Sequence, residues 1–119
     1  MNIWHALGFS AQQYLCPIRP RLGEKPRFWR DSPAHIGVFS HAQDIIVPDP
    51  RVNSLSVHAP ASGVIVKLVQ KYTSWGNTPD FLPFLNYVTV RTPIPGEFYQ
   101  LCHIAAHSCI YRIGDRVEV

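Results

Sequence analysis

The stretch that decides the fold runs from Val57 to Val90 and reads VHAPASGVIVKLVQKYTSWGNTPDFLPFLNYVTV. A turn of small residues, Ala59 to Gly63, opens into the β-branched run Val64 to Val69, and a second β-branched run follows a long insert. β-branched residues favour extended backbone, and a run this short does not form an independent helix. The stretch therefore predicts two strands joined by a loop at the centre of a β scaffold.

Length and composition predict one globular domain. The chain has 119 residues, of which 46% are hydrophobic and 16% charged, and this balance excludes a disordered protein. Its 11 prolines favour short strands and ordered loops over long helices. No apolar stretch has the length of a membrane span, and the N-terminus lacks the features of a signal peptide. We therefore expect no membrane partner.

The first third of the chain differs in residue composition from the rest. Residues 2–15 predict a short helix. Residues 16–33 combine prolines with a cluster of Lys and Arg, and prolines at this density exclude a continuous helix or a central strand. We expect an extended basic arm that Phe28 and Trp29 anchor to the domain as hydrophobic side chains. Residues 1–33 are thus predicted to form a helix and a Pro-rich arm.

Residues 34–119 carry the pattern of a β domain. The insert Tyr72 to Pro83 is a long aromatic loop, which either lines a binding groove or is pinned by its own aromatic side chains. Gly114-Asp115 predicts a tight turn. About seven short strands separated by turns indicate an all-β barrel or sandwich. Besides the two in the central stretch, strands are expected at residues 36–39, 44–47, 98–103, 110–113 and 116–119.

The charge and the cysteines exclude several classes of protein. The net charge is +3, and five of the eleven Lys and Arg residues lie between Arg19 and Arg30. A solvated arm explains such a cluster, so nucleic acid is not an expected partner beyond a weak, salt-dependent contact. Three cysteines without a Cys-x-x-Cys motif indicate free thiols rather than a zinc ribbon. A bridge between Cys102 and Cys109 is the alternative.

Six histidines in a chain of this length suggest a metal site. A catalytic zinc needs three protein ligands and an open position for water, and imidazole is a common ligand. On a strand His41 and Asp44 would point to opposite faces, so they could share a metal only across a bulge or turn. Spacing alone does not select the ligands, and a structural role stays open for each residue. The candidates outside the N-terminal helix are His35, His41, Asp44, His58, His103 and His107.

The order of several motifs resembles the lysostaphin-like zinc endopeptidases, which cut the peptides of bacterial cell walls. The resemblance covers residues 34–119 and implies an all-β barrel-sandwich hybrid, or duplicated hybrid motif. It implies His35 and Asp44 as zinc ligands, His103 as a catalytic histidine, and a place in the cell envelope or outside the cell. The motifs are Asp44 with its following IIVP, then VHAPASGVI, NYVTV, FYQLCHI and IGDRV.

One departure from the family pattern is large. The family's domain ends in a His-x-His strand that supplies the third zinc ligand and a second catalytic histidine, whereas this sequence stops at Val119 without any such pair. Two protein ligands are usually too few for a stable catalytic zinc. We therefore expect a domain truncated before that strand and inactive as it stands. An exposed sheet edge would favour a homo-oligomer, and a peptidoglycan peptide or another peptide is the expected ligand.

Two other classes of protein stay open. A non-catalytic β module of the same build could bind a glycan, a peptide or another protein, and would hold no stoichiometric zinc. A biotinyl or lipoyl carrier domain is the other reading, because Ala59 to Val64 also resembles the hairpins of those domains. A carrier needs a modifiable lysine at a hairpin tip. Neither Lys67 nor Lys71 has that setting, so this reading ranks last.

Overall fold

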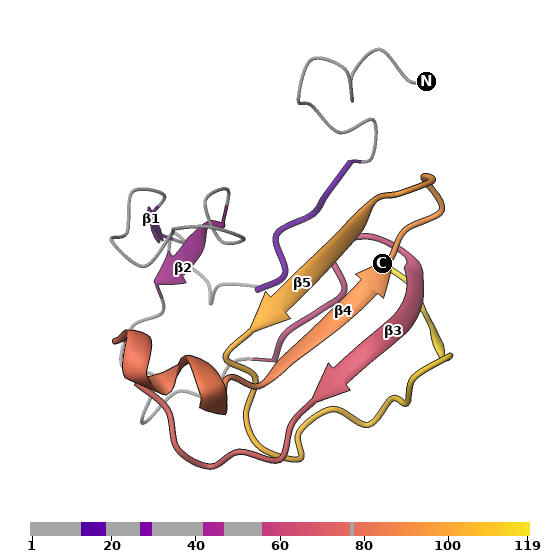
Figure 1. Ribbon diagram of the computed structural model, residues 1–119. Coiled ribbons are helices and arrows are strands. Elements are labelled where there is room, and N and C mark those ends of the chain that lie inside the picture. The colour runs from indigo at the N-terminus through magenta and orange to yellow at the C-terminus, as the bar shows by residue number, and fades with distance from the viewer. Residues whose placement is uncertain (1–12, 19–26, 30–41, 47–55, 77) are drawn as a thin grey trace.

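The computed structural model describes residues 13–18, 27–29, 42–46, 56–76 and 78–119. The strands in these ranges form two antiparallel sheets, so the prediction of an all-β protein is confirmed (Figure 1). They do not form a closed barrel. The elements are β1 (Arg27–Trp29), β2 (Asp44–Ile46), β3 (Gly63–Val69), the 3-10 helix η2 (Pro79–Phe84), β4 (Tyr87–Arg91), β5 (Phe98–Cys102) and β6 (Arg116–Val117).

The larger sheet has the strand order β5-β4-β3-β6 and is antiparallel throughout. Its two central strands, β3 and β4, are the two β-branched runs that the sequence predicts as a strand pair. They pair from Val69 opposite Tyr87 to Val64 opposite Arg91. The register shifts between Ile65 and Lys67, so β3 carries one extra residue there.

One face of this sheet holds the core. Ile65, Val88 and Val90 are 2%, 8% and 2% exposed. Because side chains alternate between the two faces of a strand, the residues between them lie on the opposite face. Burying an aliphatic side chain of this size contributes about 1.5–3 kcal/mol. The half-buried residues that pack against these three are Leu68, Tyr99, Leu101, Ile104 and Val117.

Gly63 is buried at the start of β3, where neighbouring chains approach closely. A Cβ at this position would collide with the carbonyl oxygen of Arg91 and with Cγ1 of Val90. The glycine therefore allows the turn before β3 to lie against β4, which explains why a small-residue turn opens the strand.

The C-terminal segment lies along β3 and forms hydrogen bonds with it. The amide of Ile65 donates to the carbonyl of Asp115 at 2.9 Å, and the amide of Gly114 donates back to the carbonyl of Ile65 at 2.8 Å. Gly114 has a φ of 95°, which confirms the predicted turn. The predicted strand at 110–113 is wrong, because these residues make no ladder with β3 and expose 87% of Ile110 and 63% of Ile113.

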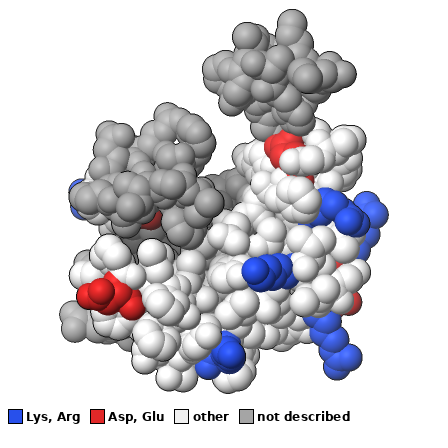
Figure 2. All heavy atoms as spheres, in the orientation of Figure 1, with Lys and Arg blue, Asp and Glu red and all other residues white. Residues whose placement is uncertain are grey.

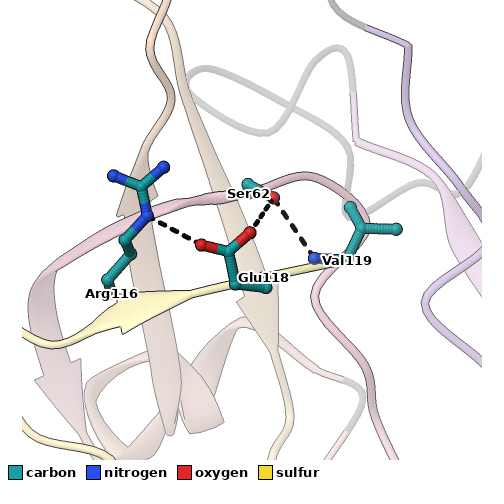
Figure 3. Close-up of polar contacts among 4 residues, drawn as sticks. All are labelled: Ser62, Arg116, Glu118 and Val119. Carbon is teal, nitrogen blue, oxygen red and sulfur yellow. Dashed lines mark hydrogen bonds and ion pairs between the residues drawn. The ribbon is translucent and has the colours of Figure 1, made fainter.

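A small polar network holds the end of the chain, as Figure 3 shows. The hydroxyl of Ser62 donates to Glu118 at 3.4 Å and accepts from the amide of Val119 at 3.2 Å. Arg116 Nε donates to Glu118 at 2.8 Å. The ion pair is exposed and adds little stability of its own. The carboxylate of Glu118 offsets the positive charge of Arg116.

The second sheet pairs β1 with β2, with Trp29 opposite Asp44. The predicted arm thus contributes a strand, although not a central one. Phe28 and Trp29 stay 50% and 48% exposed, so they are only partly buried anchors. Most of the predicted N-terminal helix lies outside the described residues, and Gln13 to Leu15 are not helical. No helix in the described ranges is long and apolar enough to cross a membrane.

Candidate functional site

The loop that follows β5 has an unusual backbone. His103 has a φ of 62° and His107 a φ of 55°, which places both in the left-handed region. Non-glycine residues are uncommon there, although His is enriched among them, and the conformation persists only where the surroundings hold it. Both histidines are exposed. The structure therefore presents two imidazole-bearing residues on one braced loop.

The buried side chain of Asn86 braces the start of this loop. Its amide accepts from the backbone of Tyr72 at 3.1 Å and donates to the carbonyls of Tyr72 at 2.7 Å and Ile104 at 3.3 Å. The carbonyl of Asn86 also accepts from the amide of His103 at 2.9 Å. Asn86 is 7% exposed, so these bonds satisfy groups that water does not reach easily. They fix His103 relative to the sheet.

Gln70 braces the other end in a similar way. Its side chain accepts from the amide of Cys109 at 2.8 Å and donates to the carbonyl of Cys109 at 3.2 Å. Its backbone carbonyl accepts from the amide of His107 at 2.8 Å. The side chain of Gln70 thus takes both backbone hydrogen-bonding groups of Cys109, which in a strand would pair with a neighbouring strand. Residues 103–109 are held from both sides.

The charge of Asp44 acts on the last residue of β5. Burial, and after it the negative charge of Asp44, raises the pKa of the Cys102 thiol to about 11. This influence of Asp44 acts through space, because no Cα of β2 lies within 8 Å of a Cα of β5. Cys102 is protonated at neutral pH and is not a thiolate nucleophile. All three cysteines are free, as expected.

The other predicted site residues are spread over the chain. His35 and His41 lie outside the described residues. His58 is half-buried, and its amide donates to the carbonyl of Pro17 at 2.7 Å, far along the chain from the β5 end. Over the ranges that the structure describes, His, Cys, Asp and Glu side chains form no group of three or more that could hold a metal. The zinc site therefore stays a prediction.

The two bracing amides were missed by sequence reasoning. An asparagine just before a β-branched run reads as an ordinary loop residue. Its partners Tyr72 and Ile104 are 14 and 18 positions away, and no spacing rule connects them. Gln70 and Cys109 are 39 positions apart. Only the pairing of β3 with β4 brings these residues together.

The chain was compared with known proteins. A scan against protein-family models finds no match, and neither the search of curated proteins nor that of solved structures finds one. The resemblance to lysostaphin-like peptidases therefore stays a prediction.

Proposed function

We propose that this chain is a zinc-peptidase-like domain related to the peptidoglycan endopeptidases, built as a barrel-sandwich hybrid. Two observations support it: the order of the motifs, and the charge of Asp44, which contributes to the raised pKa of Cys102 at the end of β5. The resemblance assigns a zinc ligand to Asp44 and a catalytic role to His103, which follows Cys102 directly. Asp44 and His103 are 59 positions apart in the sequence, and the proposal requires the fold to bring their side chains to one site.

The donor chemistry fits zinc in kind. Carboxylate oxygen and imidazole nitrogen are both common zinc ligands, and Asp44 and His35 would supply one of each. Zinc in such a site polarises the scissile carbonyl and lowers the pKa of its bound water. His103 would stabilise the developing oxyanion or move a proton, which its place on a braced loop favours. Because the sequence has no His-x-His pair, we expect no hydrolysis from this chain alone.

Zinc binding by purified protein tests the proposal. Isothermal titration with zinc, checked by elemental analysis, should show one weak site in the unaltered chain. His35→Ala and Asp44→Ala should each remove it. His58→Ala is the matched control, because it deletes an imidazole that the resemblance does not assign to zinc and should leave the zinc isotherm unchanged. Equal zinc binding by the control and by both test variants would refute the ligand assignment.

A second candidate is a non-catalytic β module of the same build. The partly exposed second face of the larger sheet favours it. This candidate predicts no stoichiometric zinc and retention by insoluble cell-wall peptidoglycan or by a soluble peptide of it. Co-sedimentation with purified peptidoglycan, in the presence and absence of a chelator, distinguishes the two: a chelator should release the zinc-dependent form only.

A further inference from the structure

The face of the larger sheet that lies opposite the core carries a defined set of side chains. Directly opposed residues of an antiparallel pair share a face, so the register alone fixes the set. One row across the sheet is Arg116, Val64, Arg91 and Phe98. The next row is Lys67, Thr89 and Gln100, and the third is Val69, Tyr87 and Cys102. We call these three rows the outer face.

The outer face is basic, and five of its ten side chains are exposed. Lys67, Arg91 and Gln100 are exposed, and Phe98 is 52% exposed. In Figure 2, Lys and Arg side chains are spaced over the region where Figure 1 draws β3, β4 and β5, while most acidic side chains lie toward its margins. The described residues give neither Lys67 nor Arg91 a carboxylate partner.

The third basic residue of this face is already neutralised. Arg116 is paired with Glu118 at 2.8 Å, and Ser62 holds Glu118 from the other side (Figure 3). Hydrogen bonding from Arg116, with its charge, lowers the pKa of the Glu118 carboxyl, which keeps it ionised at neutral pH. Two charges, those of Lys67 and Arg91, are therefore available to an anionic ligand.

Two aromatic rings accompany these charges. Phe98 stands directly opposite Arg91, and the Nζ of Lys67 lies 5.4 Å from the ring centroid of Tyr87. The rows of Tyr87 and Phe98 are four residues apart on β4, which is roughly 13 Å. Between them the Gln100 amide donates to the Thr89 hydroxyl at 3.0 Å. Each end of the face thus pairs a ring with a cation, with hydrogen-bonding groups in between.

We propose that the outer face binds single-stranded nucleic acid, with Phe98 stacking on a base and Arg91 and Lys67 contacting phosphates. Proteins bind single strands without sequence preference by combining a basic surface with stacking rings, and an open antiparallel sheet can carry both. An acidic peptide would use the two cations but would have no need for an exposed Phe98. The sequence alone did not predict this partner, because its basic residues concentrate in the arm.

Fluorescence anisotropy of a labelled 12-nucleotide oligo(dT) tests the proposal. Phosphate contacts by two cations should give a salt dependence with a slope of about −1.4, since each contributes about −0.7. Lys67→Gln and Arg91→Gln should each weaken binding and flatten the slope by about 0.7. Glu118→Gln frees Arg116 and should tighten binding and steepen the slope by a similar amount. Arg112→Gln removes a charge outside the three rows and is the matched control.

The role of the ring is tested separately. Phe98→Ala should weaken binding roughly 5- to 100-fold, because stacking on an aromatic ring contributes that much per base. Phe98→Trp should restore it, and both variants should unfold at the temperature of the unaltered chain because the ring is exposed. The proposal is overturned if oligo(dT) does not saturate at low salt, or if Arg112→Gln weakens binding as much as Arg91→Gln. It is also overturned if Phe98→Ala binds normally while polyglutamate competes fully, which would indicate an acidic peptide.

Discussion

Replacing Asn86 with alanine should destabilise the whole domain and loosen the loop that carries His103. Asn86 sits just before β4 and is 7% exposed. Its side-chain amide bonds both backbone groups of Tyr72 and the carbonyl of Ile104. Alanine removes the side-chain partner of all three groups at once. The long loop before β4 and the loop after β5 would then lose their shared attachment.

The magnitude follows from the three lost bonds. A buried hydrogen bond contributes about 0.5–1.5 kcal/mol net, and a group left unsatisfied costs more than that. The expected loss in the free energy of unfolding is therefore about 2–4 kcal/mol. For a domain of this size that lowers the melting temperature by roughly 8 °C or more. A loss this large is a substantial share of the stability of a small domain.

Urea denaturation followed by circular dichroism measures this loss. Gln100→Ala is the matched control, because it also deletes a side-chain amide, but one that makes a single exposed bond to Thr89. The control should lose less than about 0.5 kcal/mol. Amide hydrogen exchange should show faster exchange at His103 in Asn86→Ala. If Asn86→Ala and the control unfold at the same urea concentration, Asn86 does not brace the loops as described.

Three further predictions concern single positions. Gly63→Ala should cost about 1–3 kcal/mol in urea denaturation, because the new methyl group meets the carbonyl oxygen of Arg91; wild-type stability would contradict the close approach. His103→Val should lower the free energy of unfolding by about 1–2 kcal/mol, whereas His103→Gly should not lower it through the backbone, because only glycine adopts this left-handed φ freely. Equal losses in the two variants would contradict backbone strain at this position. Asp44→Asn should lower the pKa of Cys102 below about 11, because the lost negative charge no longer disfavours the thiolate. The pH dependence of Cys102 alkylation, with the other two cysteines replaced by serine, measures this pKa, and an unchanged profile would show that Asp44 does not act on Cys102.

The central strand pair was predictable because it depends on local chemistry. The β-branched runs at Val64–Val69 and Tyr87–Val90 extend the backbone wherever they lie, and Gly114 permits a turn of positive φ on its own. The strand expected at residues 110–113 is also rich in apolar and aromatic side chains, but these residues pair with no described strand. The Gln70 side chain takes the backbone groups of Cys109 instead. Tertiary contacts determine the conformation of this segment, and its local sequence does not indicate them.

The outer face could not be predicted for a related reason. Val64 and Lys67 are three positions apart, so strict alternation would place them on opposite faces of a strand. The extra residue at Val66 returns both to the outer face, and only the register with β4 reveals it. Strict alternation would have put Lys67 on the same face as the core residue Ile65. The basic character of this face depends on a single bulge.

The two proposals both involve the surroundings of β5 but depend on different residues. Cys102, whose pKa the charge of Asp44 helps to raise, lies at one end of the outer face, and Phe98 with Arg91 lies at the other end of the same strand pair. Loss of zinc binding in Asp44→Ala should therefore leave oligonucleotide affinity no weaker, since removing a carboxylate also removes repulsion of phosphate. Loss of oligonucleotide binding in Phe98→Ala should leave the zinc isotherm unchanged. If either variant abolished both activities, the two ends would act as one site, and a single ligand spanning β5 would have to explain both.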